Sequence, residues 1–316
     1  MRTANVNGRL CLLDGAGTVD VQYASGGQFD AAPARIYDRW EEFTNWARKA
    51  SLPAPDALTD SGVLGPPSPE PRQVIAVGLN YGGHAEESGF GRPESGPSVF
   101  TKFPSSITGP YGEVRLPEGG HTDWEVELVV VIGRGAYRVK EQNAWSHVAG
   151  LTVGQDISER ILQMSASPPQ FSLGKSYLGF GPTGPWLVTP DELSDPDDLA
   201  LGCSINGERV QKGRTGDLIF SVPELVARLS YVMPLWPGDL LFTGTPAGVG
   251  MARTPQRWLT AGDELVSYVE GIGEMRHRFI RLSRERRDQW GFTGSSRRRW
   301  ASRTSPRPWT ITRSSG

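Results

Sequence analysis

The run from Leu128 to Ile132 is apolar at every position, so a strand formed by it is apolar on both faces. A strand at the protein surface alternates apolar and polar side chains, whereas a strand covered on both faces does not. The run therefore predicts a buried strand over 125–132. Further short apolar runs predict strands at 74–77, 148–153, 199–205, 239–243 and 264–269.

Turn residues and helical patterns complete the fold prediction. The 39 glycines and 25 prolines favour many turns and short strands over a helix bundle. Helical patterns are fewer, at 35–50, 84–89, 157–164 and 222–233, and residues 8–22 predict a hairpin. The sequence therefore predicts a β-rich α+β protein.

A proline-rich segment starting at Leu64 marks a predicted domain boundary. We expect a small N-terminal α/β domain at 1–66 and a catalytic domain at 67–282. Residues 283–316 combine many arginines with serine, threonine, proline and glycine and have no apolar period, which predicts a disordered tail.

Composition excludes several classes of protein. A net charge of −2 gives no reason to expect a nucleic acid or an anionic membrane as partner. The two cysteines, Cys11 and Cys203, form neither a disulfide framework nor a cysteine-rich zinc site. The N-terminus lacks the apolar region of a signal peptide, and no run reaches the roughly 18 apolar residues of a membrane helix. We therefore expect a soluble protein in the cytoplasm.

Acidic residues alternate at the start of the buried strand. Asp123, Glu125 and Glu127 are two residues apart, so they share one face of a strand. Acids at the mouth of a buried strand need a partner, and hard oxygen ligands select Mg²⁺, Mn²⁺ or Ca²⁺. A solvated acidic edge strand is the alternative. Asp156 ends another apolar run, as a third ligand or as the cap of the helix that follows.

Four other features suggest chemistry. His84 and Glu87 are three residues apart on a predicted helix, where a carboxylate can orient an imidazole as a general base. Arg160 and Gln163 can face the same pocket as Asp156. Lys175 lies in Gly-Lys-Ser, but the position where a phosphate-binding loop needs its first glycine is a proline. The glycine-rich loop at 244–250 fails as a dinucleotide motif and predicts a tight loop near a ligand.

Taken together, these segments resemble the fumarylacetoacetate hydrolase family. The motifs that carry the resemblance keep their order and spacing over residues 72–280, and they are Gly-Leu-Asn-Tyr-Gly-Gly-His84-Ala-Glu-Glu87, Asp123-Trp-Glu125-Val-Glu127-Leu, Gln-Asp156-Ile-Ser-Glu-Arg160, Lys175-Ser, Gly184-Pro-Trp and Gly244-Thr245-Pro-Ala-Gly-Val-Gly. The resemblance implies a mixed β-roll catalytic domain and a homodimer.

The resemblance also implies roles for individual residues. In these roles, Glu125, Glu127 and Asp156 hold Mg²⁺ or Mn²⁺, with Ca²⁺ as a further option, and Asp123 supports the site without binding the metal. His84 and Glu87 form the water-activating dyad, and Lys175 stabilises developing negative charge. Arg160, Gln163 and Thr245 contact the substrate. Founding fumarylacetoacetases have one more aspartate ligand ahead of the histidine. Residues 77–81 contain no acid, so this chain resembles the shorter prokaryotic acylpyruvate hydrolase and 2-hydroxyhepta-2,4-diene-1,7-dioate isomerase branch.

The function implied is hydrolysis of a C–C bond in an acylpyruvate, a 2,4-dioxo acid, through a metal-bound enolate. The same site supports alternatives, namely decarboxylation or isomerisation of 2-oxo or 2-hydroxy-dienoic diacids, as in aromatic catabolism, and hydration of an oxo-pentenoate. A non-catalytic scaffold that binds a metal or an oxo acid is an alternative of another class.

Overall fold

A computed structural model describes residues 1–281, apart from residues 16, 59–62, 90, 92 and 94. Residues 1–281 form one compact unit. The predicted arginine-rich tail lies outside the described residues, and so do three positions of the loop that follows α3 (Gly82–Glu87).

A large mixed sheet forms the centre of this unit. Its strands follow the order β4-β3-β2-β1-β14-β12-β11-β17-β6-β7, with β5 paired to β1 and β8 to β14. Most pairs are antiparallel, but β17 pairs with β6, and β14 with β8, in parallel. The strands are β1 (Arg2–Val6), β2 (Arg9–Asp14), β3 (Gly17–Asp20), β4 (Asp56–Ala57), β5 (Leu64–Gly65), β6 (Val74–Gly78), β7 (Ser98–Thr101), β8 (Ile107–Thr108), β11 (Val126–Ile132), β12 (Val148–Gln155), β14 (Gly181–Val188) and β17 (Leu240–Phe242).

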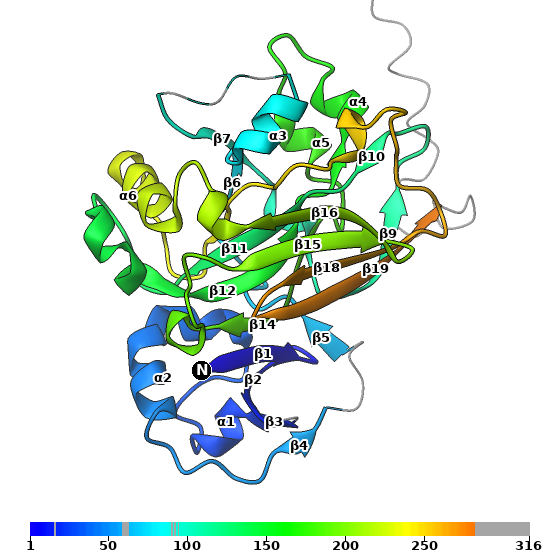
Figure 1. The fold of residues 1–316 in the computed structure, drawn as a ribbon. Coiled ribbons are helices and arrows are strands. Elements are labelled where there is room, and N and C mark those ends of the chain that lie inside the picture. The colour runs from blue at the N-terminus through cyan, green and yellow to red at the C-terminus, as the bar shows by residue number, and fades with distance from the viewer. Residues whose placement is uncertain (16, 59–62, 90, 92, 94, 282–316) are drawn as a thin grey trace, which may run out of the picture. The chain divides into compact units, whose positions relative to one another are not determined.

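A second, five-stranded sheet with the order β16-β15-β18-β19-β9 packs against the first. Figure 1 shows its strands crossing in front of β11 and β12. Its strands are β9 (Tyr111–Leu116), β15 (Ala200–Ile205), β16 (Glu208–Arg214), β18 (Glu264–Val269) and β19 (Gly273–Arg281). A short third pair joins β10 (Thr122–Asp123) to β13 (Ser158–Glu159).

Short helices lie around the sheets. In Figure 1, α3, α4 and α5 gather at one end of the molecule, while α1 and α2 accompany the N-terminal strands at the other. The α-helices are α1 (Val21–Ala24), α2 (Trp40–Ala47), α3, α4 (Arg160–Gln163), α5 (Phe171–Gly174) and α6 (Val222–Val232), and the 3-10 helices are at Pro33–Arg39, Pro104–Ser106, Glu141–His147, Pro190–Glu192, Thr215–Asp217 and Gly250–Ala252.

Strand β11 is the buried strand that the sequence predicts. All seven of its residues are buried. Leu128 and Val130 join a core cluster with residues of the second sheet, whereas Val129 and Val131 join another cluster with residues of α2 and β6. The strand therefore separates two hydrophobic cores, which explains why neither face carries a polar side chain after Glu127.

The N-terminal segment joins the central sheet directly. Strand β1 pairs with β14, and Arg2 lies opposite Val188. The predicted hairpin is formed by β2 and β3. The helix expected at 35–50 is divided into a 3-10 helix that ends at Arg39 and α2, which begins at Trp40. The domain boundary at residue 66 stays a prediction.

The fold confirms the predicted β-rich α+β class and corrects two local predictions. The helix predicted over 157–164 begins only at Arg160, because Ser158 and Glu159 pair with β10 as a short strand. The acidic segment is likewise not one continuous strand, since β10 ends at Asp123 and β11 begins at Val126. No helix among the described residues is long and apolar enough to cross a membrane.

Candidate active site

Three carboxylates come together where β11 and β12 meet. Glu125 precedes β11, Glu127 lies within it, and Asp156 follows β12. The backbone nitrogen of Asp156 donates to the carbonyl of Glu125 at 2.9 Å, which joins the two segments at this point. One oxygen from each carboxylate lies within 4.8 Å of the others, and all three residues are buried. The arrangement is able to hold a metal ion.

The three acids differ in their surroundings. Burial raises the pKa of Glu125, but Lys175 and Arg160 outweigh burial and lower it to about 2. Burial and the carboxylates of Asp156 and Glu125 raise the pKa of Glu127 well above its usual range. Glu127 accepts a hydrogen bond from the backbone nitrogen of Gly244 at 2.7 Å and forms no ion pair with a described residue. Its carboxylate is therefore the acid whose negative charge is least compensated.

This donor set fits a hard divalent cation. Carboxylate oxygens are the ligands that Mg²⁺, Mn²⁺ and Ca²⁺ prefer, and no described cysteine or histidine belongs to the group. A divalent charge at this position would supply the counter-charge that Glu127 lacks. The fit therefore rests on the chemistry of the ligands and on their mutual repulsion.

Two cations also contact the cluster. The Lys175 ammonium donates to Glu125 Oε2 and Asp156 Oδ2, both at 2.7 Å, and to Ser158 Oγ at 2.8 Å. Burial lowers the pKa of Lys175, but Asp156 and Glu125 outweigh burial and raise it. Arg160 Nη2 lies 2.7 Å from Glu125 Oε1. Lys175 is thus a protonated group whose three N–H bonds all have protein partners.

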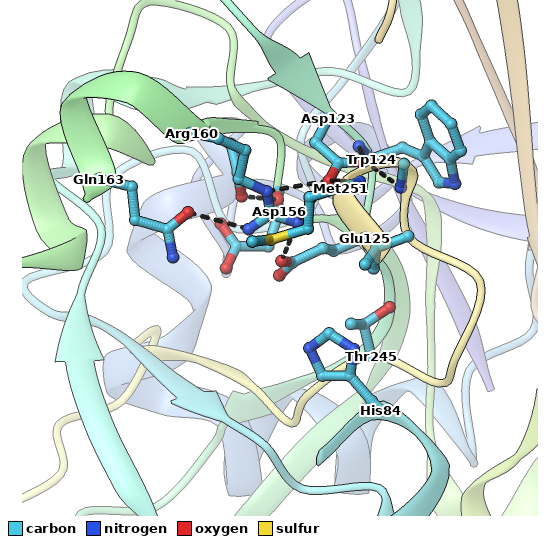
Figure 2. Close-up of polar contacts among 12 residues, drawn as sticks. His84, Asp123, Trp124, Glu125, Asp156, Arg160, Gln163, Thr245 and Met251 are labelled. Carbon is cyan, nitrogen blue, oxygen red and sulfur yellow. Dashed lines mark hydrogen bonds and ion pairs between the residues drawn. The ribbon is translucent and has the colours of Figure 1, made fainter. Parts of the chain in front are cut away.

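Asp123 lies outside the carboxylate triad and anchors its surroundings. Its Oδ2 accepts from Arg160 Nε at 2.9 Å and from the backbone nitrogen of Met251 at 3.0 Å, and its Oδ1 accepts from the backbone nitrogen of Gly250 at 2.6 Å. Figure 2 shows Asp123 beside Arg160 and Met251. Arg160 Nη1 in turn donates to Gln163 Oε1 at 2.9 Å. Asp123 therefore fixes the direction of the Arg160 side chain.

His84 and Glu87 form the predicted pair. His84 Nδ1 lies 2.9 Å from Glu87 Oε1, and both residues belong to α3. Glu87 also accepts from the backbone nitrogen of Gly248 at 2.9 Å, so the carboxylate is held from a second side. Figure 2 shows the His84 ring opposite Glu125 and Asp156. With Nδ1 engaged by Glu87, Nε2 is the nitrogen available to a bound molecule.

The glycine-rich loop at 244–250 binds acids through its backbone. Gly244, Gly248 and Gly250 each donate their N–H to a different carboxylate, those of Glu127, Glu87 and Asp123. Gly244 has a φ of +104°, and a Cβ on Gly250 would lie 2.0 Å from the carbonyl oxygen of Arg257. The loop was predicted to approach a ligand closely, and its backbone lies against the acids of the site.

A pocket beside these groups is lined by both polar and apolar side chains. The polar side chains include those of His84, Glu125, Arg160, Gln163 and Lys175. The apolar side chains that line it are those of Leu79, Phe100, Met164, Phe171 and Met251. Leu79 has a φ of +58°, a strained conformation for a leucine, and the adjacent Asn80 is fully buried and bonds to Phe220 and Thr243. The β6–α3 connection is thus held in a fixed shape.

The predicted site residues gather in this region, and their chemical roles stay predictions. Thr245 lies near His84 (Figure 2), but its hydroxyl donates to the carbonyl of Val126 at 2.8 Å and accepts from Gln211. Asp156 is not a helix cap, because Glu159 caps α4 by accepting from Ile161 N and Leu162 N.

Several residues of the site were not identified from the sequence, among them Lys102, Ser158 and Leu79. Lys102 is fully buried and contacts Asp156, Ser158 contacts Lys175, and Leu79 lines the pocket. Lys102 directly follows the strand β7 (Ser98–Thr101). A lysine at the end of a strand could have been recognised in the sequence as a candidate site residue. Nothing in the sequence indicates the partners of Ser158 or the φ of Leu79.

These features define a class of protein, a β-rich fold with a buried acidic cluster suited to a hard divalent cation beside a histidine–glutamate pair. The chain belongs to the fumarylacetoacetate hydrolase family, since residues 73–280 match the family model described as Fumarylacetoacetate (FAA) hydrolase C-terminal.

Among the relatives is oxaloacetate tautomerase FAHD2A, a mitochondrial protein from Homo sapiens, which is 44% identical over 208 residues. The match covers 66% of this chain and 66% of that protein, so the chain spans slightly less than two thirds of the length of this relative.

Solved bacterial structures match most of the chain. An HpcE-type protein from Mycobacterium smegmatis is 55% identical with a TM-score of 0.86, and the match covers 90% of this chain and 100% of that one. Maleylpyruvate hydrolase from Sphingobium sp. SYK-6, solved with manganese(II) and pyruvate, is 28% identical with a TM-score of 0.74, and the match covers 90% and 100%. These structures share the fold described above.

Proposed function

We propose that this protein is a Mg²⁺- or Mn²⁺-dependent hydrolase that cleaves a C–C bond in an acylpyruvate, a 2,4-dioxo acid. The observation that carries the proposal is the His84–Glu87 pair facing the carboxylate triad. Hydrolysis requires a base that removes a proton from the attacking water, whereas tautomerisation uses no attacking water. Manganese(II) and pyruvate in the maleylpyruvate hydrolase structure support the metal and the 2-oxo acid end of the substrate.

In this proposal, Glu125, Glu127 and Asp156 hold the cation. When bound, a divalent cation supplies Lewis acidity toward the 2-oxo acid end of the substrate. Arg160 is fixed by Asp123 and lines the same pocket, so it can pair with the substrate carboxylate. Gln163 accepts a hydrogen bond from Arg160 and lines the same pocket, so it can also contact the substrate.

The charge of the site suits an anionic substrate. Its buried acids are Asp123, Glu125, Glu127 and Asp156, and its buried cations are Lys102, Arg160 and Lys175. With every group in its charged form, four negative and three positive charges leave a net charge of −1. A divalent cation changes this to +1, and the partly buried Glu87 carboxylate beside His84 brings the sum to 0. The cation thus removes the net negative charge that would repel a substrate carboxylate.

In this proposal, His84 activates the attacking water. Glu87 accepts a hydrogen bond from the Nδ1–H group of His84. The other ring nitrogen, Nε2, is then unprotonated and can take a proton from water. The hydroxide attacks the distal carbonyl carbon, and the bond between that carbon and the pyruvate methylene breaks. The bonding electrons go to the pyruvate part as an enolate, and the proton on His84 returns to its carbon. The products are a carboxylic acid and pyruvate.

Lys175 stabilises the developing negative charge through its own positive charge. All three of its N–H bonds already have partners, and its pKa is raised by Asp156 and Glu125. It therefore acts as a fixed cation and not as a proton donor. Thr245 has its hydroxyl engaged by Val126 and Gln211, so we propose that any contact it makes with substrate uses a different atom.

Tautomerisation of a 2-oxo diacid is the second candidate. The 44% identity to an oxaloacetate tautomerase favours it. This reaction exchanges a proton between carbon and oxygen and breaks no C–C bond. It requires the cation and a proton carrier, but no attacking water.

Product analysis separates the two candidates. Acetylpyruvate with Mg²⁺ or Mn²⁺ should yield acetate and pyruvate in equal amounts. The His84→Ala variant should lose about 10²–10⁴-fold in kcat, the range for general-base catalysis. Tautomerase activity on enol-oxaloacetate without cleavage of any of a panel of acylpyruvates would refute the hydrolase proposal. The homodimer and the cytoplasmic location stay predictions.

A further inference from the structure

A second lysine lies behind the carboxylate triad. Lys102 follows β7 and is fully buried. Its ammonium donates to Asp156 Oδ1 at 2.6 Å and to the backbone carbonyl of Lys175. The ring of Phe242 lies 5.9 Å from the nitrogen. Lys102 is not among the described residues that line the pocket, and its hydrogen bonds to the site are those to Asp156 and Lys175.

A buried ammonium is costly for a fold to keep. Burial lowers the pKa of Lys102, and Asp156 is the main group that opposes this effect. A buried ion pair is weak support for stability, since apolar residues of similar volume often serve as well. A role beyond stability therefore explains this lysine better than a packing role does.

The contacts of Lys102 hold both the carboxylate of Asp156 and the backbone of Lys175. Lys102 binds one oxygen of Asp156 and Lys175 binds the other, so the plane of the carboxylate is set from both sides. Lys175 is the C-cap residue of α5, and its backbone carbonyl accepts from Lys102, so this bond holds the backbone from which the Lys175 side chain extends. One ammonium group thus connects Asp156, a proposed metal ligand, with Lys175, the proposed fixed cation.

We infer that Lys102 is a positioning residue, which orients Asp156 as a metal ligand and places Lys175 beside it. This inference rests on the proposed metal site. It concerns the geometry of the site and does not require Lys102 to touch the substrate or to change its protonation.

The test is the Lys102→Met variant, which keeps the length of the side chain and removes the charge. The direct readout is the Kd for Mn²⁺, measured by electron paramagnetic resonance at constant pH and ionic strength. We expect affinity to weaken about 10–100-fold, the usual effect of losing a residue that orients a metal ligand. With acetylpyruvate at saturating Mn²⁺, kcat should fall and KM should stay within about threefold, because Lys102 does not line the pocket.

Three outcomes can be told apart. Weaker Mn²⁺ binding with a lower kcat supports positioning. Tighter binding means that Lys102 only opposes the metal charge, and this result overturns the inference. Binding and kcat within about twofold of wild type, with a lower Tm, make the lysine merely structural and also overturn it. His277→Gln serves as the control, because it replaces a buried polar side chain bonded to the backbone of Gly109, outside the site.

A destabilised variant still gives an answer. Mn²⁺ stabilises the folded state by an amount that grows with the logarithm of the ratio of its concentration to Kd, so the shift in Tm reports binding even at a low starting Tm. Lys102→Gln can bond one of the two partners but not both, and an effect between those of wild type and Lys102→Met is expected. Wild-type protein that binds Mn²⁺ but cleaves no acylpyruvate refutes the proposed function and leaves the Lys102 inference to be decided by the Kd.

Discussion

Replacing Asp123 with asparagine tests whether this acid anchors Arg160 and the 250–251 backbone instead of binding the metal. The two side chains have the same shape, so the change removes one charge and replaces one acceptor with a donor. Oδ1 accepts from Trp124 N and Gly250 N, and Oδ2 accepts from Met251 N and Arg160. Whichever way the amide turns, its NH₂ group meets two donors.

The size of the effect follows from these contacts. Two buried hydrogen bonds are lost, at about 1–3 kcal/mol each when a donor is left unpaired. Arg160 keeps Glu125 as an ionic partner, so the total should lie near the range for breaking a buried pair, about 3–5 kcal/mol. For a unit of this size, the loss corresponds to a decrease in Tm of about 6–20 °C.

Calorimetry and a Mn²⁺ titration together give the answer. Asp123→Asn should lower Tm by the stated amount, reduce kcat/KM for acetylpyruvate at least about tenfold, and change the Mn²⁺ Kd by less than about tenfold. Asp198→Asn is the control, because the ion pair that it removes, with Arg214, is exposed, so Tm should stay nearly unchanged. A Tm within about 3 °C of wild type would refute the anchoring role. Loss of Mn²⁺ binding in a folded variant would instead make Asp123 a ligand.

Three further predictions follow from the geometry. Glu87→Gln should lower kcat about tenfold or more by weakening the base, whereas Glu86→Gln on the exposed face of α3 should have no effect, and equal rates in the two variants would exclude the dyad. Burial lowers the pKa of His277 to about 4 from an unfolded value of 6.5, so the unfolded state binds more protons between these values and stability decreases as pH falls. Denaturant unfolding should show a loss of about 3 kcal/mol between pH 7 and pH 4 from this residue, absent in His277→Gln. Removing divalent metal with EDTA should abolish turnover and lower Tm, and Mn²⁺ should restore both, whereas full activity after complete metal removal would contradict the proposed site.

The sequence predicts the central strands well because their signal is local. All seven residues of β11 are buried, and the five from Leu128 to Ile132 are apolar on both faces, which is evident from the sequence. The acids at its start were found for the same reason, since Glu125 and Glu127 interrupt an otherwise apolar pattern. Their connection to Asp156 came from the family resemblance, because no local pattern joins residues 30 apart.

Other parts of the site depend on contacts between distant segments. The helix predicted from Ile157 begins later, since pairing of β13 with β10 overrides the helical pattern at Ser158 and Glu159. The role of Lys102 depends on a carboxylate 54 residues away. The glycine pattern at 244–250 indicated close approach, but only the structure identifies carboxylates as the groups approached.

The 244–250 loop has a consequence for how this protein tolerates mutation. Its three amide groups hold Glu127, Glu87 and Asp123, which serve three different tasks. Main-chain donors are not removed by changing a side chain, so these three contacts depend on the path of the loop and not on the identity of its side chains. A side chain at Gly244 or Gly250 would displace that path and disturb several acids together. A substitution at one of these glycines should therefore impair metal binding, water activation and substrate orientation together, whereas a substitution of one acid, such as Glu87, impairs mainly the task of that acid.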